Sequence, residues 1–143
     1  MNHKTVCLLG CSKQKAPNQT TAENLYQGVY FKKALEYAKH KNGDILVLSA
    51  KHYVLKLSDI VAPYDLTLIK MSSKECREWA TIVRKQLMEK GYNLQKDYFV
   101  FLTGKNYYQN LVPYMTNYEI VGEGKSIGQK LHELDKLNNQ FKQ

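Results

Sequence analysis

Residues that can hold anions or move protons follow directly after a short apolar run near the start of this sequence. The segment GCSKQK, residues 10–15, places Cys11, Ser12, Lys13 and Lys15 immediately after the run TVCLL. Backbone N–H groups in such a turn, together with lysine ammonium groups, can hold a phosphate or a carboxylate. Cys11 is also a candidate nucleophile, which requires a nearby base and a lowered pKa. The alternative is a turn that only faces solvent.

A second group of titratable side chains ends the apolar run DILVLSA. It contains Ser49, Lys51 and His52. A lysine at a strand end can hold an anion, and a histidine can move a proton near neutral pH. A dozen residues further on, Tyr64 offers a stacking surface and Asp65 a general base or a group that positions water. The alternatives are a structural histidine and a turn that Asp65 caps.

Two further segments carry candidate binding residues. Tyr26 precedes a predicted helix, where an exposed ring would stack on a base and a buried ring would pack in the core. Gly124 and Ser126 lie in GEGKSIG, where a glycine turn and a helix N-cap can bind a phosphate. This segment is not a Walker loop, because Glu119 stands five residues before Gly124, where that motif needs glycine.

Hydrophobic periodicity predicts the elements that must position these residues. Short apolar runs predict four buried strands, and apolar residues at three- and four-residue spacing predict the helices between them. The strands are expected at residues 4–12, 44–50, 97–104 and 117–124, and the helices at residues 29–41, 72–91, 106–115 and from 126 onward. The loop after the first strand is expected to stay irregular up to about residue 22, because it holds Pro17 and several Asn, Gln and Thr residues.

This alternation of strands and helices predicts an α/β fold. Right-handed crossovers give a mainly parallel, four-stranded sheet with helices on both faces. The loops after the strands then meet at one edge of the sheet, where open α/β sheets bind ligands. We therefore expect one site from the loops at residues 10–15, 49–53, 103–108 and 122–128.

Length and cysteine content bound the class of protein. A chain of 143 residues predicts one domain, residues 1–143. The apolar run near the start is too short for a signal peptide or a membrane span, so we expect a cytoplasmic protein without a membrane partner. Three cysteines indicate reduced thiols rather than disulfides. Cys7 and Cys11 have metal-like spacing, but no second Cys/His pair follows nearby, so we predict no metal and no cofactor.

The chain is strongly basic, with a net charge of +8 and a pI near 9.3. All its basic residues are lysines except Arg77 and Arg84. Such a surplus favours a polyanionic partner, nucleic acid or a nucleotide. The alternative is a lysine-rich surface that only aids solubility. No oligomeric state is predicted.

Five motifs in order resemble a family of small bacterial and phage proteins related to the peroxide-stress protein YaaA: GCSKQK, LYQGVYFKKA, LSAKHYVL, APYDLTL and SIGQKL. The resemblance covers essentially the full chain, and Tyr53 stands where that family usually has glycine. It implies an α/β fold akin to uracil-DNA glycosylases, and an association with DNA binding and protection from oxidative damage. Related domains in archaeal tRNA modification enzymes carry a similar Cys-Ser motif. The matching positions that would line the pocket are Cys11, Ser12, Lys13, Tyr26, Ser49, Lys51, His52, Tyr64 and Asp65.

Two functional hypotheses follow. The first is an enzyme that processes a nucleobase or nucleotide of nucleic acid by cleaving or exchanging an N-glycosidic bond. The two candidate tyrosines would stack on an extruded base, Lys13 and Lys51 would hold phosphate, and Asp65 or His52 would direct water. The second is a non-catalytic DNA- or nucleotide-binding module, for stress protection or for sequestering a nucleotide signal. Its affinity would fall steeply with salt.

Overall fold

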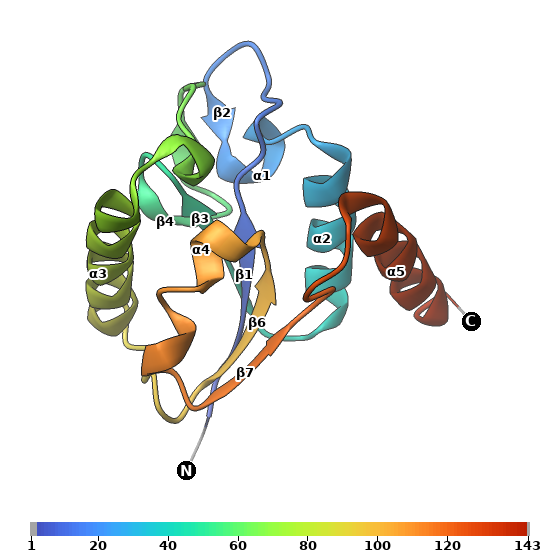
Figure 1. Cartoon of the computed structure of the whole chain (residues 1–143). Coiled ribbons are helices and arrows are strands. Elements are labelled where there is room, and N and C mark those ends of the chain that lie inside the picture. Colours follow the sequence, from blue (N-terminus) through green and yellow to red (C-terminus); the bar gives the residue numbers. More distant parts are fainter. Residues whose placement is uncertain (1–2, 143) are drawn as a thin grey trace.

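A five-stranded, mostly parallel sheet forms the centre of the protein in the computed structural model, which describes residues 3–142 (Figure 1). Residues 1–2 and 143 of the predicted domain lie outside the described residues. The strands of this sheet are β1 (Thr5–Gly10), β3 (Asp44–Ser49), β4 (Tyr53–Lys56), β6 (Tyr98–Leu102) and β7 (Asn117–Ile120). Their spatial order is β4-β3-β1-β6-β7, with β1 central and parallel to both its neighbours. The predicted α/β class is confirmed.

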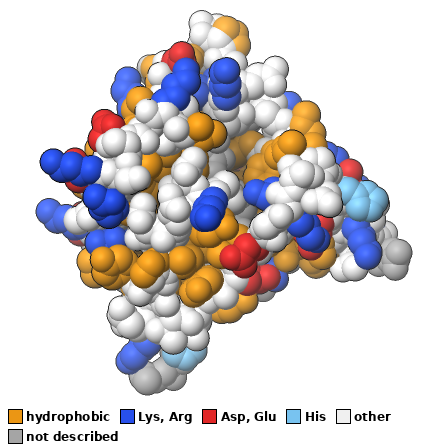
Figure 2. All heavy atoms as spheres, viewed as in Figure 1, with side chains coloured by type: hydrophobic (Ala, Val, Ile, Leu, Met, Phe, Trp, Pro, Cys, Tyr) orange, Lys and Arg blue, Asp and Glu red, His pale blue; other side chains and the backbone are white. Residues whose placement is uncertain are grey.

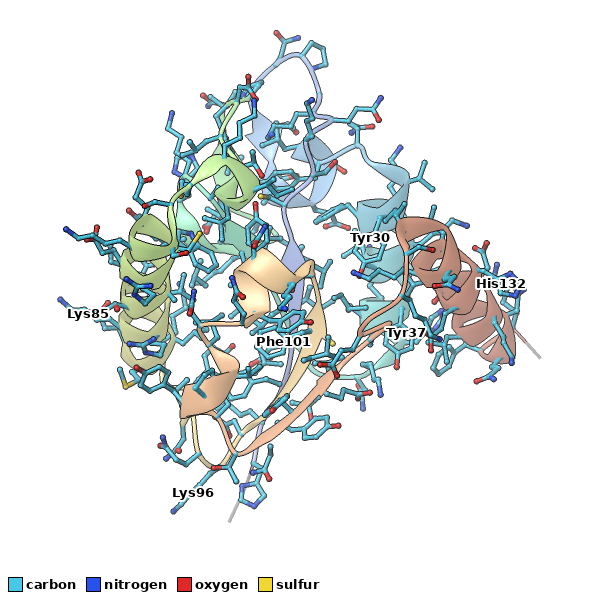
Figure 3. The ribbon with its side chains drawn as sticks, in the orientation of Figure 1. Tyr30, Tyr37, Lys85, Lys96, Phe101 and His132 are labelled. Atoms are coloured by element: carbon cyan, nitrogen blue, oxygen red, sulfur yellow. The ribbon has the colours of Figure 1, made fainter. Side chains whose placement is uncertain are left out.

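Helices cover both faces of the sheet, as Figure 1 shows. The longer helices are α2 (Val29–His40), α3 (Ser73–Glu89) and α5 (Ile127–Gln140), and the short ones are α1 (Ala22–Leu25) and α4 (Lys105–Tyr108). Successive strand residues point to opposite faces, so Val6 and Leu8 of β1 pack with α3 and α4, whereas Cys7 and Leu9 pack with α2 and α5. In Figure 3, Phe101 of β6 lies beneath α4.

The register of the central strands brings their carboxyl ends to one level. Leu9 of β1 lies opposite both Val47 of β3 and Leu102 of β6. The loops that follow these three strands therefore begin side by side at one edge of the sheet, as the parallel topology predicts.

The prediction of four strands was wrong, because β4 adds a fifth. This strand pairs antiparallel with β3 after a tight turn through Ala50, Lys51 and His52. Its four residues are too few for a period-two pattern to stand out. Tyr53, its first residue, has a φ of +65°, a left-handed conformation that glycine adopts freely and that costs other residues about 1–2 kcal/mol.

The loop predicted to be irregular also contains regular structure. The two-residue strands β2 (Thr20–Thr21) and β5 (Ile60–Val61) pair antiparallel, and α1 follows β2 directly. The helix predicted over residues 106–115 is instead divided into α4 and the 3₁₀ turn η2 (Val112–Tyr114), which has Pro113 in its first turn. Within residues 3–142, no helix combines the length and the apolar character needed to cross a bilayer.

Candidate functional site

A pocket of about 270 Å³ opens beyond the carboxyl ends of β1 and β6. This volume is near the lower end of small-molecule sites, roughly 300–1,000 Å³. The lining comes from the loop after β1, the segment that contains the 3₁₀ turn η1 (Leu68–Lys70), and α4: Cys11, Ser12, Lys13, Lys15, Asp65, Leu66, Thr67, Ile69, Lys70 and Tyr107. The pocket therefore lies at the edge of the sheet where a ligand site was expected.

The small β2–β5 pair joins the two long segments that line the pocket. One of its strands follows the loop after β1, and the other leads into the Pro-Tyr-Asp segment. The backbone N–H groups of Ala22 and Glu23 add bonds of 2.8 and 3.0 Å to the carbonyl groups of Asp59 and Leu57. The two pocket walls are therefore held together by backbone pairing between residues about 40 positions apart.

Positive charge dominates the pocket. Three lysines, Lys13, Lys15 and Lys70, line it, and Asp65 is the one carboxylate among the lining residues of the described chain. The Nζ atom of Lys15 lies 4.4 Å from the centre of the Tyr64 ring. Burial lowers the pKa of Lys15, although the nearby Cys11 and Asp65 act in the opposite direction. The arrangement suits a ligand that carries negative charge. Figure 2 shows basic side chains scattered among hydrophobic ones over this view of the molecule.

A chain of hydroxyl groups connects the turn after β3 to the tyrosines beside the pocket. Ser49 Oγ lies 2.6 Å from Tyr64 Oη, which lies 2.7 Å from Tyr26 Oη. The backbone N–H groups of Lys51 and His52 donate to Ser49 Oγ over 3.2 and 2.9 Å. Since these two donors occupy both lone pairs of the serine oxygen, Ser49 donates to Tyr64, and the Tyr64 hydroxyl shares a second hydrogen bond with Tyr26.

The buried tyrosines predict a loss of stability at high pH. Burial raises the pKa of Tyr26 to about 12, and burial also raises the pKa values of Tyr64 and Tyr107. In the unfolded chain tyrosine loses its proton near pH 10, so between about pH 10 and 12 the folded state holds more protons. The free energy of unfolding should then fall as pH rises above 10. Urea denaturation from pH 8 to 11 measures this, and Tyr64→Phe should flatten the slope. A constant free energy of unfolding over that range would contradict it.

Cys11 lies in the pocket wall with its thiol close to a phenol. Its Sγ is 3.3 Å from the hydroxyl oxygen of Tyr107, whose ring meets Trp79 edge to face at 5.5 Å. A nucleophilic cysteine needs a base to remove its proton. The Tyr107 hydroxyl, with its raised pKa, holds its own proton at neutral pH. This contact favours a binding role for Cys11 over a nucleophilic one.

Ser12 is fixed by two hydrogen bonds that depend on a glycine. Its Oγ accepts from the N–H of Gly28 at 2.9 Å and donates to the carbonyl oxygen of Gln14 at 3.0 Å. A Cβ atom at Gly28 would lie 2.4 Å from Ser12 Oγ. The glycine thus allows the start of α2 to approach the pocket loop closely.

Gly28→Ala should therefore lower the free energy of unfolding by about 1–2 kcal/mol, because Ser12 must move and lose both bonds, each worth about 1 kcal/mol. Gly104→Ala is the matched control, since a Cβ there has no atom within 4 Å, and it should change stability by less than about 1 kcal/mol. Urea denaturation of both variants tests this. Equal stability of the two variants would show that Ser12 adjusts without loss.

The structure brings four of the predicted site residues into the pocket lining and places a fifth against a lining residue. Cys11, Ser12, Lys13 and Asp65 line the pocket, and the ring of Tyr64 lies against Lys15. Four lining residues of the segment 65–70 were not predicted: Leu66, Thr67, Ile69 and Lys70. Tyr107 was indicated only by the position of its loop after β6.

Two residues predicted to contact a substrate, Tyr26 and Ser49, are buried outside the pocket lining. Tyr26 is only 1% exposed and packs on Phe31 at 5.2 Å, so its ring is not available to stack on a base. Ser49 is fully buried and supports Tyr64 instead of reaching a ligand. Both residues act behind the pocket wall, because the turn after β3 and the segment before α2 pack inward.

Lys51 and His52, predicted to be catalytic, lie outside the pocket lining. The His52 ring meets the Tyr64 ring edge to face at 5.4 Å, and Lys51 Nζ lies 6.0 Å from the same ring. Burial, together with the charge of Lys51, lowers the pKa of His52. Of the three predicted catalytic residues, Asp65 is therefore the one in the pocket.

The predicted phosphate-binding residues Gly124 and Ser126 are also outside this pocket. Ser126 caps α5, with its Oγ accepting from the N–H of Gln129 at 3.2 Å, and its own N–H donates to the Gln129 side chain at 2.9 Å. These residues follow the edge strand β7, which β6 separates from β1. The expectation that all four strand-end loops form one site was therefore wrong, since only two of them contribute to its lining.

The side chains that could bind a metal ion do not cluster within residues 3–142. Across residues 3–142, no group of three or more His, Cys, Asp or Glu side chains is placed to hold a metal ion. The pocket instead presents lysine ammonium groups and hydroxyl groups.

The part of the chain that matches a known protein family includes the whole pocket lining. One family model matches residues 6–136, from the second residue of β1 into α5. This range contains every residue that lines the pocket. No curated protein matches the chain.

Proposed function

The chain belongs to DUF6884, a family of unknown function, and we propose that it binds a nucleotide, or a nucleobase of nucleic acid, and cleaves or exchanges its N-glycosidic bond. The observation that carries this proposal is the grouping of three lysines and one carboxylate in a small pocket with apolar and aromatic walls. The lysines suit a phosphate and the walls suit a base.

The lysines would bind the phosphate of the ligand through charge, and the apolar residues would contact its base. Lys13 and Lys70 are exposed and line the pocket, so they can meet a phosphate without losing an existing ion pair among the described residues. Leu66 and Ile69 offer apolar contact, and Tyr107 adds an aromatic edge. Stacking and apolar contacts tolerate any base, so specificity would come from polar groups such as Ser12 and Thr67.

Cleavage of a glycosidic bond would use Asp65 and Lys15. The bond between the sugar carbon and the base nitrogen breaks with both electrons going to the base, so positive charge develops on the sugar. The Asp65 carboxylate would stabilise that charge and direct a water molecule or another acceptor to the sugar carbon. The departing base needs a proton, and Lys15 can supply it, because a lowered pKa makes its ammonium a better acid.

The sequence resemblance supports the same class of function. Four positions that match YaaA-like motifs, Cys11, Ser12, Lys13 and Asp65, are in the pocket lining. Kinship with YaaA-like proteins, and with the fold of uracil-DNA glycosylases, is part of this proposal. A cytoplasmic location is part of it as well.

A non-catalytic DNA- or nucleotide-binding module is the second candidate. The net charge of +8 favours it, because such a surplus is far more than one pocket requires. A binding module would depend on many lysines, and its affinity would fall steeply with salt.

The test is base release. The protein is incubated with plain and base-modified single- and double-stranded DNA, tRNA and free nucleotides, and the small molecules are analysed by mass spectrometry. A freed or exchanged base would support the enzyme and identify its substrate. Salt-sensitive binding without any product would favour the binding module.

A further inference from the structure

The two arginines of this chain lie together in a second hollow, apart from the pocket. The hollow measures about 270 Å³ and lies between α3 and the segment after α4. Its lining residues are Arg77, Thr81, Arg84, Asn110, Pro113 and Tyr114. The other 19 basic residues are lysines, so this hollow is lined by both arginines of the chain.

Arg84 is held in a fixed orientation. The central carbon of its guanidinium lies 3.6 Å from the centre of the Tyr114 ring. Its Nη1 donates to the carbonyl oxygen of Asn110 at 3.1 Å, and its Nη2 donates to Thr81 Oγ1 at 3.4 Å. A guanidinium has five N–H donors, so three remain for a ligand. A planar group fixed in this way loses little freedom when it binds an anion.

Arg77 adds a second positive charge that is not neutralised. It lies two helical turns before Arg84 on α3, on the same side of the helix, and it is exposed. Neither arginine forms an ion pair within residues 3–142, and the six lining residues include no carboxylate. The exposed ring of Tyr114 completes a cationic surface with an aromatic face.

We propose that this hollow binds a backbone phosphate of nucleic acid, so that the substrate of the pocket is a polynucleotide rather than a free nucleotide. That the substrate is a polynucleotide rests on the proposed function of the pocket. The phosphate site itself rests only on the two arginines. Guanidinium groups bind phosphate oxygens through paired hydrogen bonds. An exposed aromatic ring beside them suits a nucleotide better than an acidic peptide.

The pocket and the hollow share the chain segment that follows β6. Tyr107 lines the pocket and Asn110 lines the hollow, three residues later in the chain. Consecutive Cα atoms are 3.8 Å apart, so these two lie at most about 11 Å from each other. Because one short segment contributes to both sites, a single strand that contacts both is compatible with the structure.

The experiment measures the binding of a labelled 15-nucleotide single-stranded DNA by fluorescence anisotropy between 50 and 200 mM salt. Arg77→Ala should weaken binding about tenfold, as expected for a lost charge-assisted hydrogen bond, and should lower the slope of log affinity against log salt by about one. Arg84→Lys, which keeps the charge but loses the planar group, should weaken binding as well. Lys85→Ala is the control, because Lys85 lies next to Arg84 on α3 but outside the hollow (Figure 3). It should change affinity less than twofold.

The outcomes separate this proposal from the function of the pocket. Equal affinities of the Arg77→Ala and Lys85→Ala proteins would overturn the phosphate site. Polyglutamate that binds as tightly as the DNA, with the same dependence on Arg77, would assign the hollow to an acidic protein partner and overturn it too. Absence of base release, with the arginine effect intact, would reject the enzyme and keep the phosphate site. Base release from free nucleotides as fast as from DNA, unchanged by Arg77→Ala, would overturn the polynucleotide substrate.

Discussion

Asp65→Asn is expected to reduce the rate of base release by at least about 100-fold, the lower end of what one positioned acid–base group contributes. The amide keeps the size of the carboxylate and removes the charge that would stabilise the sugar as its bond to the base breaks. Because Asp65 is exposed, the free energy of unfolding should change by less than about 0.5 kcal/mol. Single-turnover base release, followed by mass spectrometry, measures the effect on the chemical step.

The control for this substitution is Asp135→Asn. Asp135 is an exposed carboxylate on α5, where it pairs with Lys33 and lies outside the pocket. Its loss should leave the rate of base release unchanged. Ligand affinity of the Asp65→Asn protein should stay within a few-fold of the wild type, since the pocket lysines remain. Full activity of the Asp65→Asn protein would remove Asp65 from the chemistry.

Trp79→Ala is expected to lower the free energy of unfolding by about 3–5 kcal/mol, the usual cost of emptying a large aromatic site in a core. Trp79 is 3% exposed and lies on the inner face of α3. Its indole N–H donates to the carbonyl oxygen of Ser49 at 2.9 Å, and its ring contacts the Tyr107 ring. The substitution should also weaken ligand binding, because Ser49 supports Tyr64 and Tyr107 lines the pocket.

Two variants separate the causes of this effect. Trp79→Phe keeps most of the ring and loses the hydrogen bond, so it should cost about 1–3 kcal/mol. Ile82→Ala, at a partly exposed position of the same helix, should cost less than about 1 kcal/mol. Urea denaturation measures all three. A loss of less than 1 kcal/mol in Trp79→Ala would mean that α3 closes over the space and that the Ser49 carbonyl finds another donor.

The sequence by itself determined the elements whose signals are local. The apolar runs of β1, β3, β6 and β7 and the helical spacing in α2, α3 and α5 each lie within one continuous segment. Ser126 was indicated as an N-cap, and it forms a capping box with the side chain of Gln129. The parallel topology alone placed Cys11, Ser12 and Lys13 at the carboxyl edge of the sheet, where open α/β sheets generally bind ligands.

Only the tertiary structure decided which polar residues face the pocket. Tyr26 and Tyr64 meet across 38 residues of sequence, and Cys11 and Tyr107 across 96. Such contacts depend on how distant segments pack. The type of a residue does not show whether its side chain will face the pocket or the core. The motifs therefore indicated the edge of the sheet at which the pocket lies, while burial keeps Tyr26 and Ser49 out of its lining and packing places Tyr107 in it.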